Sequence, residues 1–68
     1  MVTFELRATL SEDEAFALRH VLDRQIDAIK YIERRESQDI PEEIKHEKQA
    51  ATRILRALEE AMQRETAN

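Results

Sequence analysis

Aromatic and basic side chains in the first half of the chain have the residue types of a binding surface. Rings supply contact area, and guanidinium groups bind carboxylates or phosphates through paired hydrogen bonds. The pattern indicates a surface for a protein partner, or for an anionic small ligand such as a nucleotide. For the first of the rings a second interpretation stays open, in which Phe4 or Leu6 of a folded-back N-terminal segment, or another subunit, covers it. The candidate residues are Phe16, His20, Arg24, Tyr31, Arg34 and Arg35.

Arginine outnumbers lysine by eight to three in this chain. If subunits assemble so that arginines of one chain meet Tyr31 or His20 of another, fork contacts and ring stacking could hold an anionic ligand. In the alternative interpretation these arginines form exposed ion pairs, for example Arg56 with Glu60. Such a pair stabilises a helix by only about a few tenths of a kcal/mol.

Glu43 and His46 have the Glu-x-x-His spacing that is typical of one kind of metal site. Ferritin-like di-iron bundles combine this spacing with a glutamate from a facing helix, which Glu33 or Glu36 would supply. Because His46 projects away from the apolar face, we expect a solvated pair and no bound metal. The chain has no glycine loop for phosphate and no cysteine. We therefore expect no catalytic residues, no cofactor and no enzymatic activity.

Residues 2–10 alternate between apolar and polar side chains, and this period of two predicts a β-strand. With the capped helix that follows, the strand resembles the opening of the ribbon-helix-helix family, dimeric DNA-binding repressors in which each subunit contributes one strand to the major groove. The resemblance implies that Thr3 and Arg7 would face the DNA. Glu5 on the same side and the net charge of −4 oppose contact with phosphates. Otherwise the strand pairs between subunits or packs on helices.

Two helices are predicted after the strand. Ser11 with a glutamate three residues later forms a capping box, which predicts a helix over 11–36. A turn over 37–40 follows, and Pro41 with two glutamates after it starts a second helix over 41–66. Because the turn is short, the two helices should be antiparallel neighbours.

Apolar residues at helical spacing in both helices define the predicted core. Gln25, with Thr52 opposite, is predicted to form a polar layer within it. Two helices leave half of each apolar stripe facing water, and a cysteine-free chain of 8.0 kDa has little other means of stabilisation. The expected fold is mainly α, a single domain (1–68) with a short N-terminal β-strand followed by a long antiparallel helical hairpin that self-associates into a helical bundle. The predicted core residues are Leu18, Leu22, Ile29, Ile32, Ile44, Ile54, Leu55, Leu58 and Met62.

Composition narrows the classes of function. The chain lacks a signal-peptide pattern and any uncharged stretch near the roughly 20 residues that span a bilayer, so we expect a cytoplasmic protein without a membrane partner. The leading hypothesis is a non-enzymatic homodimer or higher oligomer that binds another protein as a regulator, adaptor or inhibitor, as bacterial and phage accessory proteins do. An oligomer that binds or sequesters an anionic small ligand is the alternative. A ribbon-helix-helix-like repressor is the third.

Overall fold

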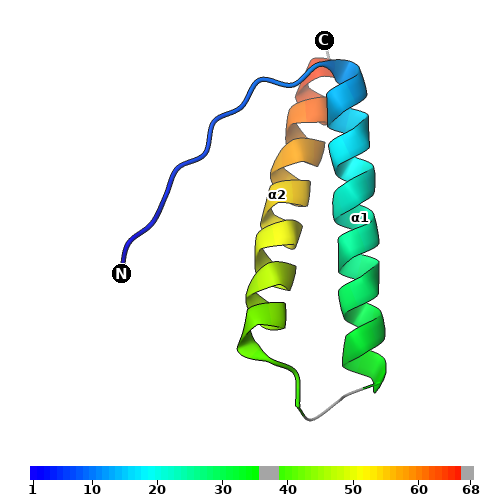
Figure 1. Cartoon of the computed structure of the whole chain (residues 1–68). Coiled ribbons are helices and arrows are strands. Elements are labelled where there is room, and N and C mark those ends of the chain that lie inside the picture. Colours follow the sequence, from blue (N-terminus) through cyan, green and yellow to red (C-terminus); the bar gives the residue numbers. More distant parts are fainter. Residues whose placement is uncertain (36–38, 67–68) are drawn as a thin grey trace.

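Two long helices make up most of the structure. The computed structural model describes residues 1–35 and 39–66, with α1 spanning Glu12–Arg35 and α2 spanning Glu42–Thr66. The helices run antiparallel and side by side (Figure 1), which confirms the predicted helical hairpin. Each helix starts one residue later than the ranges 11–36 and 41–66, while the predicted end at residue 36 and part of the turn lie outside the described residues. Among the described residues, neither helix has the length and apolar character needed to cross a membrane.

A reciprocal pair of hydrogen bonds fixes the start of α1. The Ser11 amide donates to Glu14 Oε1 at 2.9 Å, and the Glu14 amide donates to Ser11 Oγ at 3.1 Å. These two bonds satisfy amides that have no partner inside the helix. The Glu14 carboxylate accepts from the Ser11 backbone amide, and this bond, followed by the interaction of the carboxylate with the Ser11 side chain, lowers the pKa of Glu14 below its usual value. The capping box therefore forms from local sequence alone.

Pro41 sets the start of α2 in a comparable way. Its carbonyl accepts hydrogen bonds from the amides of Ile44 and Lys45 at 3.1 and 3.3 Å. Proline lacks an amide hydrogen, but in this position the helix needs only its carbonyl. Glu42 and Glu43 lie in the first turn, where carboxylates interact favourably with the positive end of the helix dipole.

The core between the helices is small. Only Leu22, Ile29 and Ala51 are buried among the described residues, and Ile29 alone is almost fully enclosed, with 1% of its surface exposed. Ile54, which we predicted in the core, lies at its edge and is 40% exposed. The seam is extended by half-buried apolar side chains at Ala15, Leu18, Ile26, Ile32, Ile44, Leu55, Leu58 and Met62.

The predicted polar layer is absent from this core. Gln25 is exposed, and the neighbouring Ile26 is half-buried in its place; Thr52, the predicted partner of Gln25, is half-buried too. The reason is helical geometry, because each residue turns the helix by about 100° and Gln25 and Ile26 therefore lie on opposite sides of the line through Leu22. Gln25 and Ile26 follow Leu22 by three and four residues, and both separations are compatible with an apolar helix face; the apolar residue is the one turned toward α2. Gln25 points to the edge of the hairpin instead.

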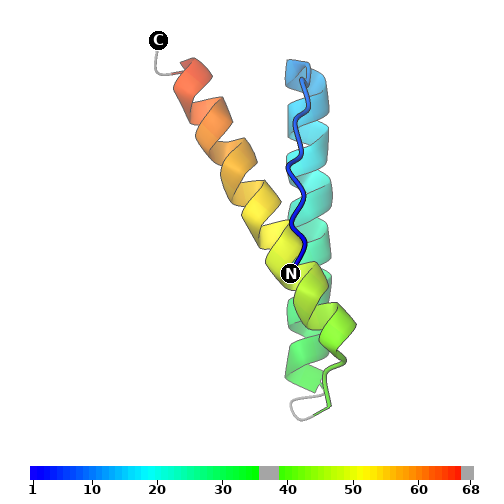
Figure 2. The ribbon, with the colours of Figure 1, turned by 90° about the vertical axis from the view of Figure 1, so that its left-hand side faces the viewer.

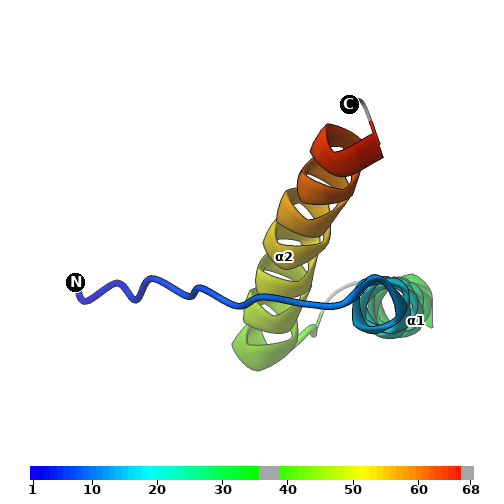
Figure 3. The ribbon, with the colours of Figure 1, turned by 90° about the horizontal axis from the view of Figure 1, so that it is seen from above.

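Residues 1–10 form an extended arm and no strand, so the strand prediction is wrong for the single chain. The arm leaves the N-terminal end of α1, passes toward the α2 side and continues away from both helices (Figures 1 and 3). Phe4 and Leu6 are 90% and 82% exposed. A strand needs another strand to accept and donate its backbone hydrogen bonds, and the described residues of one chain provide none.

The helices cross at an angle, and ion pairs connect them near both ends. Figure 2 shows them diverging toward the N-terminus of α1, whereas in Figure 1 they are further apart near the turn. Near the turn, Lys48 Nζ lies 2.8 Å from Glu33 Oε1, and at the other end Arg19 Nη2 lies 3.9 Å from Glu59 Oε2. The sequence predicts that the chain folds back near residues 38 and 39, which sets the residues of α1 and α2 that lie opposite each other. The two ion pairs match this predicted pairing to within about one helical turn.

Candidate binding surfaces

The predicted contact residues of α1 lie in a long row on its outer side. Successive members are four or seven residues apart, that is one or two helical turns, so they share one helix face, and all are exposed. Phe16 and Tyr31 are separated by about 22 Å at 1.5 Å per residue. A row of this length suits an extended partner and cannot close around a single small ligand. We call Phe16, His20, Arg24, Tyr31 and Arg35 the outer row; Arg34 lies beside its turn end.

Tyr31 and Arg35 are the two members of the outer row that contact each other. Arg35 Nη1 donates to the Tyr31 hydroxyl at 3.4 Å, and the guanidinium carbon lies 5.8 Å from the centroid of the ring. Both side chains are exposed, so this cation–π contact contributes little to stability. The arginine–tyrosine combination expected across subunits thus exists within one helix.

Phe16 is not covered by the arm. The interpretation in which Phe4 or Leu6 packs on this ring is wrong for the single chain, because both side chains are almost fully exposed and Phe16 is itself half exposed. Thr3 and Arg7, the DNA-contacting candidates, are exposed on the same extended arm. The arm and the outer row are therefore separate surfaces.

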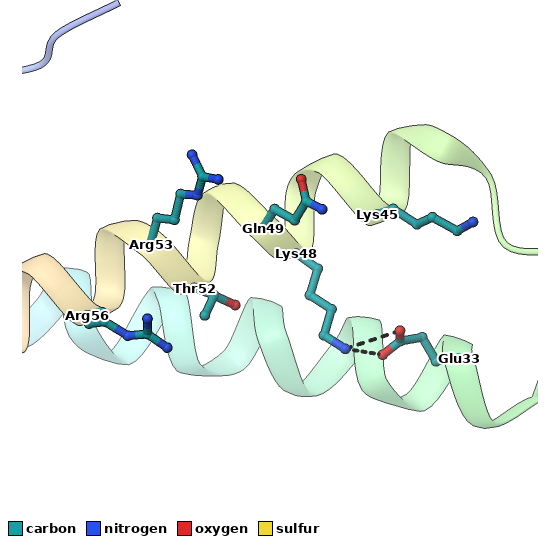
Figure 4. A pocket seen from close by; sticks show the side chains of 7 residues that line it. All are labelled: Glu33, Lys45, Lys48, Gln49, Thr52, Arg53 and Arg56. Carbon is teal, nitrogen blue, oxygen red and sulfur yellow. Dashed lines mark hydrogen bonds and ion pairs between the residues drawn. The ribbon is translucent and has the colours of Figure 1, made fainter.

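A groove on the α2 side of the hairpin was not predicted from the sequence. Its volume is about 490 Å³, and Figure 4 shows Lys48 reaching across it to Glu33 of α1. Four cations and one carboxylate line it, which gives a local excess of positive charge in an acidic protein. The sequence signal was present, because most of these residues recur every four positions along α2. The lining residues are Glu33, Lys45, Lys48, Gln49, Thr52, Arg53 and Arg56.

The cations of this groove do not converge on one point. Lys48 is paired with Glu33, and Lys45 Nζ lies 3.4 Å from Glu42 Oε1. Arg53 points away from α1 while Arg56 extends along it (Figure 4), and neither forms an ion pair with another described residue, Glu60 included. The groove is therefore a basic surface, and its geometry is too open to enclose a small anion.

The Glu-x-x-His pattern brings no cluster of metal ligands together. Within residues 1–35 and 39–66 no group of three or more histidine, cysteine, aspartate or glutamate side chains could hold a metal ion. Glu33, the proposed third ligand, accepts from Lys48 at 2.8 and 3.1 Å. Glu36, the other one, lies outside the described residues.

Comparisons with protein-family models, with curated proteins and with solved structures give no match to this chain.

Proposed function

We propose that this chain is a non-enzymatic binding protein of the cytoplasm, which works as a homodimer or higher oligomer and acts on another protein as a regulator, adaptor or inhibitor. The observation that carries the proposal is the uncovered apolar arm. Phe4 and Leu6 are 90% and 82% exposed in the single chain, and exposing such side chains to water is unfavourable unless a partner covers them.

The alternation of the arm defines how it would bind. An extended segment can add a strand to the open edge of another sheet, where backbone hydrogen bonds supply affinity and alternate side chains enter apolar pockets. In the arm the even-numbered residues form the apolar side and Thr3, Glu5 and Arg7 the polar side. The expected partner is thus a protein with an exposed sheet edge, and the strand predicted over residues 2–10 forms only in the complex.

The two other hypotheses receive less support. A nucleotide binder would need Tyr31 and several arginines around one small site, and the outer row spreads them along α1. A ribbon-helix-helix-like repressor would need the arms of two subunits to pair and present Arg7 to DNA, with Glu5 beside it and a net charge of −4 opposing the phosphates. The positive charge of the basic groove would suit either a nucleotide or DNA. Its cations, however, point in different directions or are already paired with glutamates.

A photo-crosslinking amino acid placed in the arm of the full-length protein tests the proposal in its native host cells. At position 4 we expect an adduct with one protein, and the adduct should be lost when Leu6→Ser is added and retained with Arg7→Gln. Adducts at the polar position 3 serve as the control and should be weaker. Adducts with this chain alone, or none at position 4, would contradict the proposed protein partner.

Two binding assays with the purified protein distinguish the alternative functions. Retention of DNA that weakens with salt and disappears in Arg7→Ala would favour the repressor. A nucleotide-dependent rise in melting temperature that is lost in Tyr31→Ala or Arg35→Ala would favour the ligand binder. Either result would replace the protein-binding proposal as the leading function.

A further inference from the structure

Apolar side chains remain uncovered along one face of the hairpin as well as on the arm. Val21 of α1 is 57% exposed and Ile54 of α2 is 40% exposed. Small apolar residues accompany them, since Ala28 on α1 and Ala57 and Ala61 on α2 are exposed too. Isolated exposed apolar residues are common on proteins, but a continuous strip of them marks a contact surface.

These residues from the two helices lie on the same face. Val21 comes one residue before the buried Leu22, and Ile54 comes one residue before Leu55 of the seam. A step of one residue turns a helix by about 100°, and because α1 and α2 are antiparallel, the same step turns both side chains to the same side of the hairpin. Arg56, one residue after Leu55, turns to the opposite side, where the basic groove lies.

The spacing of this face is that of helix-to-helix packing. On α1 the positions are separated alternately by three and four residues, as in the seam of a coiled coil. On α2 the same alternation links Ala50, Ile54, Ala57 and Ala61, with Leu58 beside them. The alanines allow helix backbones to approach closely, and Gln25 is the single polar residue in the row on α1. We call the following residues the apolar face: Leu18, Val21, Gln25, Ala28 and Ile32 of α1, with Ala50, Ile54, Ala57, Leu58 and Ala61 of α2.

We propose that the apolar face is the contact surface for a second copy of this chain, with α1 of each copy packed against α2 of the other in an antiparallel four-helix bundle. This inference deepens the self-association that is part of the proposed function, and it rests on that part alone. A twofold axis parallel to the helices produces the arrangement, and it gives each α1 two antiparallel neighbours, its own α2 and that of the partner.

Charge at the edge of the face favours a second copy as the occupant. The partner's α2 lies at the same height as the chain's own α2, and the ion pair between Glu33 and Lys48 fixes that height. Arg35 at the end of the α1 row then comes level with Glu43 and Glu47 of the α2 row, and opposite charges meet across the contact. The small core argues in the same direction, because only three described residues are buried in the single chain.

Gln25 acquires a role in this arrangement. It is exposed in the single chain but becomes buried between chains, so the polar layer predicted from the sequence lies at the interface and not inside the hairpin. One polar residue in an apolar seam can set the register and the number of chains at a cost in stability.

Disulfide trapping tests the pairing, and the natural absence of cysteine keeps the test free of background. Ala28→Cys and Ala50→Cys chains, refolded together, should form a mixed disulfide dimer faster than either chain alone. Asp23→Cys mixed with Arg56→Cys is the matched control, because these exposed residues lie at nearly the same height on the opposite face. Equal rates in the two mixtures, or fastest linkage in Ala28→Cys alone, would overturn the proposal.

A substitution that preserves folding provides the second test. Gln25→Leu should lower the dissociation constant of the dimer about tenfold or more, whereas Gln49→Leu on the opposite side should leave it unchanged. Light scattering over a wide range of concentration gives the mass, expected at twice 8.0 kDa. A monomer that unfolds cooperatively, or a Gln25→Leu variant that associates no more tightly than the Gln49→Leu variant, would overturn the interface. Phe4→Ser should leave dimerisation intact, so failure of the arm proposal and failure of this one give different results.

Discussion

Replacing Ile29 by alanine should remove a large part of the stability of the hairpin. Ile29 has 1% of its surface exposed, and its truncation deletes three carbons, or about 2.4 kcal/mol of transfer free energy at roughly 0.8 kcal/mol each. A residual cavity brings the range for such truncations to about 2–5 kcal/mol. Because two helices can move together to close the space, we expect about 2–3.5 kcal/mol. A chain of this length has roughly 3–10 kcal/mol in total.

The matched substitution is Ile54→Ala, which removes the same atoms from a residue that is 40% exposed. In a single hairpin it should cost about 1–2 kcal/mol, since a smaller part of its apolar surface is buried. In the proposed dimer the cost should approach that of Ile29→Ala and should depend on protein concentration.

Urea unfolding followed by helix circular dichroism at several protein concentrations measures both costs. A loss below about 1 kcal/mol for Ile29→Ala would refute the assignment of Ile29 as the centre of the core. A larger loss for Ile54→Ala than for Ile29→Ala at low concentration, where chains are separate, would refute the burial order of the two residues.

Three further predictions follow from polar contacts. Ser11→Ala should destabilise the protein by about 1 kcal/mol because the amide of Glu14 loses its acceptor, and thermal unfolding beside Ser11→Asp, which retains an acceptor, measures the effect. The pKa of Glu14 in the folded protein lies below its usual value of 4.5. The stability that the Glu14 carboxylate contributes is therefore complete above pH 4.5 and is lost as the pH falls through the folded pKa. In an acid titration, Glu14→Gln should lose less stability than the natural chain. Lys48→Met should cost about 1 kcal/mol or less because its ion pair with Glu33 is only partly buried, and the difference from the natural chain should shrink with added salt.

Local signals made the helices predictable. The capping box at Ser11 and the proline at the start of α2 need only neighbouring residues, and the structure places the helix starts within one residue of the prediction. Predicting the apolar seam also requires knowing which side of each helix faces the other helix. This orientation decides whether Gln25 or Ile26 lies in the seam, because the spacing of the apolar residues allows either.

The arm and the groove were less accessible from sequence. Alternation over residues 2–10 identifies an extended segment, but pairing into a strand depends on a partner that the sequence does not specify. The basic groove could have been found from the repeat of Lys45, Gln49 and Arg53 at intervals of four. We missed it because the arginines were interpreted as exposed ion pairs, for example Arg56 with Glu60, and the lysines of α2 were not considered together with them.

The start of α1, to which the arm is attached, and the end of α2 lie at the same end of the hairpin, opposite to the turn (Figure 1). The chain connects the two helices only at the turn. A force that pulls the arm away from the end of α2 would therefore separate the helix contacts in order along the hairpin, first the exposed ion pair between Arg19 and Glu59, and last Ile29 and the ion pair between Glu33 and Lys48.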